Sequence, residues 1–270
     1  MVGGGQLMNE FTGQRGSQLA TLIDVNADVP VVRQTAPMAQ RRNWVTTVLL
    51  PTGDVLAGGG AEWGNADSSN AVPTEPRSYV GNPAYAPEIW RPETGTWTLG
   101  APQQRIRVYH STFLLLPNGT VLSAGGGLPG PQDNRNAEIY YPPYLFARQS
   151  GPGGGVVWAS RPRLVKSSTN FIHGHTFRLQ MADSRTIDRV SIVSLGAVTH
   201  GHNNDQRALQ LRNGDTVPEA PRQFAQRGNE LLVPLPADAN HLPPGWYMVH
   251  AVDTRGVPSR GFAFELKRSN

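Results

Sequence analysis

The sequence predicts an all-β protein, and three observations carry that prediction. Amphipathic helical periodicity is hard to find anywhere along the 270 residues. Short runs of β-branched and aliphatic residues recur instead, each bounded by turn residues. The chain also holds 30 glycines and 23 prolines, as expected for frequent turns between short strands.

The first half contains a repeated unit. It is an apolar run, a Pro-x-Gly turn, a second apolar run and a glycine triplet, as TTVLLPTGDVLAGGG (46–60) and STFLLLPNGTVLSAGGG (111–127). A second shared motif follows each copy, EIW at 88–90 and EIY at 138–140. Each unit predicts an antiparallel meander of about four strands, which is typical of a β-propeller blade. We therefore interpret residues 1–157 as a propeller fragment, because a closed propeller needs at least four blades and this stretch holds only about two.

The second half has a different sequence pattern. After the glycine-rich stretch 150–155 come short alternating runs with turn signals between them. They lie at 176–180, 190–195, 209–211, 231–235, 246–252 and 261–266. Six or seven strands in this length predict a β-sandwich of immunoglobulin-like shape over residues 158–270.

Composition excludes several kinds of site. The chain has no cysteine, so disulfides, thiol nucleophiles and Cys-ligated metals are excluded. No apolar stretch is long enough to span a membrane, and no signal-peptide pattern is present in these residues. The net charge of +4 comes from scattered arginines. We expect neither a nucleic-acid nor a membrane partner, because nucleic-acid binding needs clustered basic charge.

Histidines are the candidate metal ligands, since imidazole suits copper, zinc, iron and nickel, with copper(II) at the top of the stability order. His110 follows Tyr109 at the expected start of a strand. Neighbouring side chains of a regular strand point to opposite faces, so both could reach one metal only where a strand begins or is bulged. The alternative is a hydrogen-bonded Tyr–His pair with a structural role.

A second candidate is His200, in the polar segment THGHNNDQR (199–207). The alternative there is an Asx-type turn held by its own side chains. The other histidines are interpreted as surface or core residues: His173, His175, His202, His241 and His250.

These motifs together resemble a known family. They resemble, in the same order along the chain, the motifs of the C-terminal half of galactose oxidase and glyoxal oxidase. The motifs are RVYHS (107–111), LLLPNGTVL (114–122), EIYYPPYLF (138–146), THGHNNDQR (199–207) and PPGWYM (243–248) with GVPS (256–259). The resemblance implies a kelch-type propeller followed by an immunoglobulin-like early-set domain that sends a loop up the propeller axis. It also implies a copper radical oxidase, which oxidises a primary alcohol or aldehyde with O₂ and releases H₂O₂.

The resemblance assigns roles to residues. It implies one copper ion held by two histidines and two tyrosines, of which this chain supplies Tyr109, His110 and His200. Tyr109 matches the tyrosine that accepts the substrate proton, and Tyr85 matches an aromatic residue near the substrate pocket. Small alcohols, aldehydes or carbohydrates and O₂ are the implied partners, and the implied location is extracellular or periplasmic.

Two departures limit this expectation. The family's radical tyrosine is cross-linked to a cysteine, and neither a matching tyrosine nor any cysteine precedes Tyr109 here, so the Tyr–Cys cofactor is absent from this chain. A family disulfide is replaced by LPGP (128–131). We therefore expect an upstream propeller segment to complete the site and the chain alone to be inactive. The alternative is a noncatalytic binding or scaffold module that keeps the fold.

Overall fold

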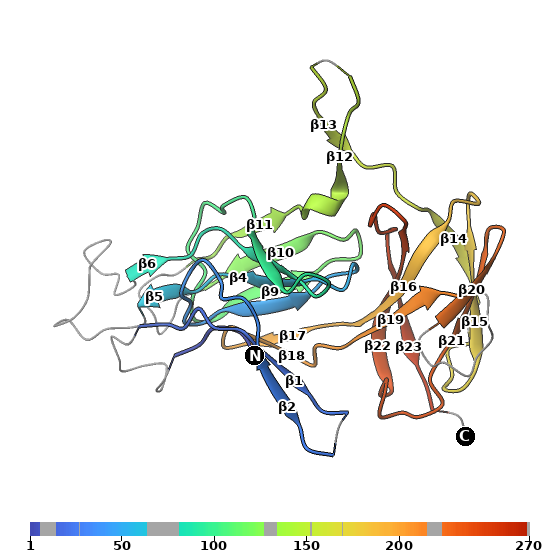
Figure 1. The fold of residues 1–270 in the computed structure, drawn as a ribbon, viewed down its shortest axis with the longest axis horizontal. Helices are drawn as coiled ribbons and strands as arrows, with labels where there is room; N and C mark the ends of the chain where they lie inside the picture. The colour runs from blue at the N-terminus through green and yellow to red at the C-terminus, as the bar shows by residue number, and fades with distance from the viewer. Residues whose placement is uncertain are drawn as a thin grey trace.

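The computed structural model describes residues 1–5, 15–26, 28–63, 81–126, 134–151, 153–168, 170–214 and 223–268. The prediction of an all-β protein is confirmed: these residues form strands, with a single short 3₁₀ helix, η1 (Pro143–Leu145). Strands of the first half lie on one side of the molecule and those of the second half on the other (Figure 1). No helix among the described residues has the length and apolar character needed to cross a membrane.

The first repeat folds as a four-stranded antiparallel meander. Its strands are β3 (Thr46–Leu49), β4 (Val55–Gly58), β7 (Glu88–Arg91) and β8 (Thr96–Leu99), paired in that order. Gly53 closes the β3–β4 turn with φ of +84°, a conformation that glycine adopts without the penalty of a Cβ. The expected blade-like unit is therefore present.

The second repeat has three described strands where about four were expected. They are β9 (Ser111–Leu115), β10 (Val121–Gly125) and β11 (Ala137–Tyr140), with β10 in the middle. Val48, Leu56, Phe113 and Val121 pack in one buried cluster, so the two repeats share a core. The segment 128–131 lies outside the described residues.

In each repeat a buried arginine just before the first strand pairs with a glutamate of the third strand. Arg42 donates to Glu88 Oε1 at 3.0 Å, and Glu88 also accepts the backbone N–H groups of Ala39 and Gln40. The guanidinium of Arg42 is fully buried, and it also donates to the backbone carbonyls of Gly59 and Ala86 and to Gln40 Oε1. The charge is thus compensated, as a buried ion must be.

The second repeat uses the same arrangement. Arg107 donates to Glu138 Oε1 at 3.3 Å and to the carbonyl of Gly125 at 2.9 Å, and Glu138 accepts the N–H groups of Gln104 and Arg105. Burial lowers the pKa of Arg107, which nevertheless stays charged beside this carboxylate. Arg107 therefore fixes the chain two residues before Tyr109.

Three two-stranded sheets accompany the meanders. They are β1 (Thr21–Asp24) with β2 (Val31–Gln34), β5 (Ala61–Trp63) with β6 (Gly81–Pro83), and β12 (Phe146–Arg148) with β13 (Val156–Trp158). The β12–β13 hairpin projects from the top of the molecule in Figure 1. It contains the glycine-rich stretch at which the boundary near residue 157 was placed, and that boundary stays a prediction.

The second half forms an eight-stranded sheet folded into two layers. Its order is β14 (Leu164–Ser167), β15 (Thr176–Met181), β21 (Glu230–Pro234), β20 (Gln223–Arg227), β19 (Ala208–Asn213), β16 (Ile187–Ser194), β22 (Gly245–Asp253) and β23 (Phe262–Leu266). Only β19 and β20 pair in parallel, and there the sheet turns from one layer to the other. One apolar cluster fills the interior with side chains of both layers, such as Phe177, Leu231, Ile192 and Phe264.

All six strands expected from apolar runs are present, and four further strands accompany them. Two of these, β14 and β20, belong to the eight-stranded sheet. The other two, β17 (Ala197–Thr199) and β18 (His202–Asn204), form a separate hairpin where a polar loop was expected. That hairpin leaves the second half and reaches the meanders of the first (Figure 1).

Candidate metal centre

The β17–β18 hairpin carries the second half of the chain to the first. It lies beside β3 and β9, and three side-chain hydrogen bonds fasten it there. Thr46 Oγ1 donates to the carbonyl of Gly201 at 2.6 Å, in a buried position. The backbone N–H of Leu49 donates to Gln206 Oε1 at 2.9 Å, and Asn203 Nδ2 donates to the carbonyl of Phe113 at 3.3 Å. His200 and Gly201 form the tip of this hairpin.

Tyr109 and His110 lie in a turn directly before β9. The turn is closed by the N–H of Ser111, which donates to the carbonyl of Val108 at 2.9 Å. His110 has φ of +62°, the left-handed conformation that breaks the alternation of a strand. The two side chains therefore lie on the same side, with ring centroids 3.8 Å apart. The start of the strand thus allows both side chains to face one metal, which a regular strand would not.

The hairpin brings His200 to the same place. Its ring centroid is 4.9 Å from that of His110 and 5.7 Å from that of Tyr109. The three predicted residues thus form one compact group, here called the ring cluster, although His200 is 90 residues further along the chain than His110.

Backbone strain gathers at the ring cluster. Five described residues other than glycine have positive φ, and His110, His200 and Trp44 are three of them. Trp44 packs with Tyr109 in a small apolar cluster, and its backbone lies beside Gly201. Left-handed conformations of such residues persist only where the surrounding structure holds them, and they occur disproportionately at functional sites.

The ring cluster is sheltered on one side and open on the other. Tyr109 is 8% exposed, His110 is partly buried, and His200 is exposed. Thr199 Oγ1 and His200 Nδ1 are hydrogen-bonded at 2.7 Å, so Nε2 is the imidazole nitrogen of His200 left to bind a metal. A hydrogen bond to the other ring nitrogen commonly orients a metal-ligating histidine.

The donor set fits copper, with a ligand missing. Two imidazoles and one phenol meet, and imidazole is a good ligand for copper in either oxidation state. Within the described ranges no group of three or more His, Cys, Asp or Glu side chains gathers around a metal-sized site. Among the described residues, the donors that a metal at the ring cluster could use are therefore the two imidazoles and the Tyr109 oxygen.

The remaining sequence candidates lie apart from the ring cluster or at its border. Tyr85 is 37% exposed. Two backbone hydrogen bonds link its neighbour Ala84 to the segment before Tyr109: the N–H of Ala84 donates to the carbonyl of Gly60, and the N–H of Gly60 donates to the carbonyl of Arg107. His173 is buried between the carbonyls of Lys267 and Leu242. His175, His202 and His241 are exposed.

His250 is fully buried and has a structural place. Its Nδ1 donates to the carbonyl of Ser259 at 3.1 Å, and Gly261 packs so closely on the ring that a Cβ would overlap it. Burial lowers the pKa of His250 to about 4, so the imidazole is neutral in the folded protein.

Sequence reasoning missed the residues that hold the ring cluster in place. Trp44 and Thr46 occupy the same positions in the first repeat as Tyr109 and Ser111 in the second, counted from Arg42 and Arg107. That correspondence could have identified Trp44 as a residue facing the same end of the sheet. The contact between Thr46 and Gly201 has no signal in the sequence.

The fold and the ring cluster define an all-β protein with a histidine–tyrosine site built from both halves of the chain. Comparison with known proteins identifies the second half: residues 161–265 match the galactose oxidase-like early set domain family, and this part of the chain belongs to it.

Relatives extend the similarity to the first half. The chain is 31% identical over 223 residues to galactose oxidase of Gibberella zeae, an alignment that covers 81% of this chain and 28% of that protein. It is 30% identical over 227 residues to the aldehyde oxidase GLOX of Vitis pseudoreticulata, covering 78% of this chain and 39% of that protein. The chain thus spans less than half the length of these relatives.

A solved structure has the same fold. It is a fungal alcohol oxidase with catalytic diversity among the AA5 family, in complex with copper, and it superimposes with a TM-score of 0.76 at 26% identity. The superposition covers 95% of this chain and 49% of the oxidase chain. The resemblance to galactose oxidase and glyoxal oxidase predicted from the motifs is confirmed.

Proposed function

We propose that this chain is the C-terminal portion of a copper radical oxidase. The reaction is oxidation of a primary alcohol to an aldehyde, or of an aldehyde hydrate (the aldehyde with one water added) to an acid, with O₂ reduced to H₂O₂. Two electrons and two protons leave the organic substrate and appear in the peroxide. The observation that carries the proposal is the meeting of Tyr109, His110 and His200, which two distant segments deliver to one place.

The chain's own residues have separate tasks in this proposal. His110 and His200 provide imidazole nitrogens to the metal, and the Thr199 hydroxyl keeps the His200 ring oriented. Tyr109 accepts the proton of the substrate hydroxyl at its phenolic oxygen, as the resemblance implies. Tyr85 borders the substrate. Bound copper supplies one-electron redox chemistry and reactivity toward O₂.

An upstream propeller segment completes the site. Copper accounts for one of the two electrons, and the family's second carrier, a tyrosine joined to a cysteine, cannot form in a chain without cysteine. The three-stranded sheet of the second repeat supports such a segment, because β11 pairs on one side only among the described residues and carries the exposed Ile139, with exposed Tyr141 directly after it. An exposed apolar edge is a template for a further strand. We propose that the complete protein acts outside the cytoplasm, as the resemblance implies.

The second candidate is a noncatalytic binding or scaffold module. It is favoured by the lack of cysteine and by the size of the ring cluster, to which the described residues contribute three donors. A chain of this kind keeps the fold and the hairpin without carrying out redox chemistry.

Peroxide release by the longest natural polypeptide that contains this chain separates the two candidates. The copper-loaded protein is offered primary alcohols and aldehydes in a peroxidase-coupled assay. We expect turnover, and a loss of about 10²- to 10⁴-fold in Tyr109→Phe, which removes the proton acceptor and keeps the ring. His202→Ala is the matched control, because His202 is exposed and lies just beyond the hairpin tip. A protein that binds copper tightly and releases no peroxide from any of them favours the noncatalytic module.

A further inference from the structure

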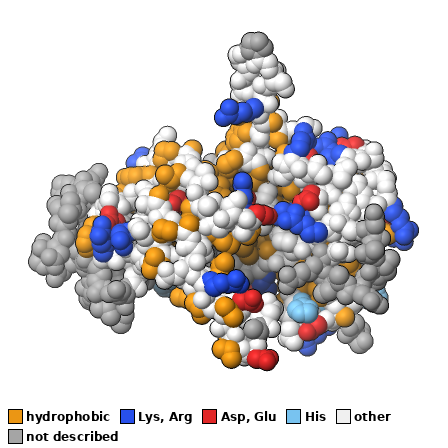
Figure 2. All heavy atoms as spheres, in the orientation of Figure 1, with side chains coloured by type: hydrophobic (Ala, Val, Ile, Leu, Met, Phe, Trp, Pro, Cys, Tyr) orange, Lys and Arg blue, Asp and Glu red, His pale blue; other side chains and the backbone are white. Residues whose placement is uncertain are grey.

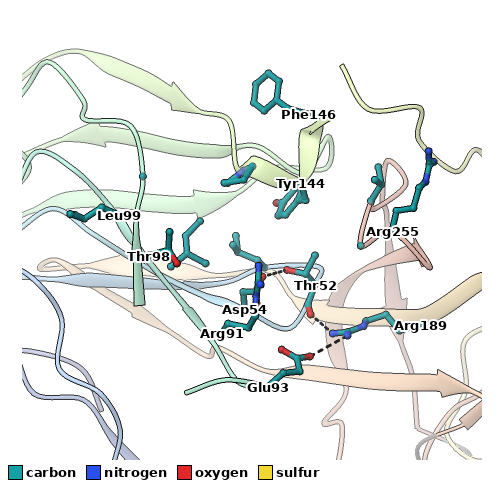
Figure 3. Close-up of a pocket in the computed structure, with 16 residues that line it drawn as sticks. Thr52, Asp54, Arg91, Glu93, Thr98, Leu99, Tyr144, Phe146, Arg189 and Arg255 are labelled. Atoms are coloured by element: carbon teal, nitrogen blue, oxygen red, sulfur yellow. Dashed lines mark hydrogen bonds and ion pairs between the residues drawn. The ribbon is translucent and has the colours of Figure 1, made fainter. Parts of the chain in front are cut away.

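A cleft lies between the first repeat and the C-terminal sheet, away from the ring cluster. Its volume is about 560 Å³, and its walls come from the β3–β4 turn, β7, β8, the η1–β12 segment, β16 and the turn after β22 (Figure 3). Small-molecule sites usually have volumes of roughly 300–1,000 Å³. None of Tyr109, His110 and His200 lines this cleft. Figure 2 shows the surface hollowed between the two halves, with charged side chains at the border.

One end of the cleft presents a carboxyl group and a guanidinium. Asp54 is buried, and its Oδ2 accepts a hydrogen bond from Thr52 Oγ1 at 2.8 Å. No described residue donates to its other carboxyl oxygen. Burial raises the pKa of Asp54, because one hydroxyl donor does not replace the lost water. A ligand that donates hydrogen bonds here would restore the missing solvation.

Arg91 is the matching donor. Its side chain is exposed at the cleft and makes no hydrogen bond or ion pair with any described residue, while its charge acts on Asp54 electrostatically. The guanidinium offers five N–H donors in a plane. Asp54 and Arg91 therefore offer an acceptor and a donor to the same ligand (Figure 3).

The other charged groups of the cleft are already paired. Arg189 donates to the carbonyl of Thr52 and forms an ion pair with Glu93. Arg255 is bound to Asp253 and to the carbonyl of Ser160. The cleft thus has no group of unpaired cations for a phosphate or sulfate, and the carboxylates of Asp54 and Glu93 disfavour an anion.

Aromatic side chains form the wall facing this pair. Tyr144 is held by its hydroxyl, which donates to the carbonyl of Gly119 at 2.5 Å, and Phe146 lies beyond it on the same side (Figure 3). Tyr144 and Phe146 are both half-buried, one face of Phe146 is stacked on Trp158, and Leu99 and Ile89 add apolar surface. Aromatic rings present a large apolar face, which suits the C–H side of a ring-shaped polyol.

We infer that this cleft binds a neutral sugar, whose adjacent hydroxyl groups donate to Asp54 and accept from Arg91 while its C–H face lies on Tyr144 and Phe146. A sugar carries donors and acceptors on neighbouring carbons, as this pair requires. The inference does not depend on the proposed oxidase activity, because none of the proposed copper ligands lines the cleft and the binding involves no chemical step.

The test is ligand binding by the copper-free chain. Saturation-transfer NMR and calorimetry are run with galactose, glucose, mannose, glycerol, inorganic phosphate and sulfate. We expect at least one hexose to bind with a millimolar or lower Kd. Asp54→Asn and Arg91→Gln each weaken it at least tenfold, which corresponds to about 1.4 kcal/mol. Arg178→Gln is the control, because Arg178 is an exposed arginine on β15, which does not border the cleft.

Two further measurements make the outcome decisive. The double variant His110→Ala with His200→Ala binds the sugar as the wild type does if the cleft is the site, whereas loss of binding places the sugar at the ring cluster and overturns the inference. Arg91→Gln alone decides if Asp54→Asn does not fold, since Arg91 is exposed. Equal binding by Arg91→Gln, binding of phosphate or sulfate alone, or no hexose binding also overturns it.

Discussion

The Thr46 hydroxyl should hold the β17–β18 hairpin, and Thr46→Val tests this with almost no change in shape. The hydroxyl donates to the carbonyl of Gly201 at 2.6 Å in a fully buried position. Valine leaves that carbonyl without its donor, and such a loss costs about 1–3 kcal/mol of unfolding free energy. At this chain length we expect the melting temperature to fall by about 2–10 °C.

The same substitution should weaken copper binding, because His200 is adjacent to Gly201 and is positioned only while the hairpin is docked. A smaller docked population lowers the apparent affinity in proportion, and we expect a loss of up to about tenfold by calorimetry. Thr47→Val is the matched control: Thr47 lies on the opposite face of β3 and its hydroxyl makes no hydrogen bond with a described residue. If Thr46→Val melts and binds copper(II) like Thr47→Val, the hairpin is not held in this way.

Three other outcomes follow from the structure. The pKa of His250 is about 6.5 in the unfolded chain and about 4 in the folded one, so the free energy of unfolding should fall by about 3 kcal/mol as the pH drops from 6.5 to 4. Urea unfolding at several pH values measures this, and His250→Asn should reduce the dependence of the unfolding free energy on pH. Expressed separately, residues 158–270 should fold because they hold their own core, whereas residues 1–157 should aggregate through open edges; a monodisperse 1–157 fragment on gel filtration contradicts this. The copper-loaded chain alone should release no more peroxide than free copper from galactose, glycerol, glyoxal or methylglyoxal, because it lacks the cysteine of the second redox carrier; turnover near 1 s⁻¹ or faster rules this out.

The strands of both halves could be predicted where apolar side chains alternate. The runs at 46–60 and 111–127 give β3, β4, β9 and β10, because each places one apolar face on a shared core. Strand β20 was missed because its polar residues outnumber its apolar ones, and β17 and β18 because they are only three residues long. Their pairing depends on partners distant in the sequence, which alternation within one segment does not reveal.

The sequence predicted which residues form the ring cluster, but it did not predict their geometry. The motifs around Tyr109 and His200 identified the residues through resemblance to a family. Left-handed backbone, as at His110 and His200, is uncommon for residues other than glycine, and nothing in the local sequence predicts it at these two positions. The bond from Thr46 to Gly201 joins residues 155 positions apart, a contact that neither segment encodes alone.

Copper(II) titration of the intact chain tests the central claim most directly. Calorimetry compares the wild type with the double variant His110→Ala and His200→Ala, and His175→Ala with His202→Ala is the control, since both of these histidines are exposed. We predict one copper(II) per wild-type chain, weaker binding than in a site with all four ligands, the same binding in the control, and none at that site in the double variant. Equal copper binding by the double variant and the wild type would contradict the assignment of the metal to the ring cluster.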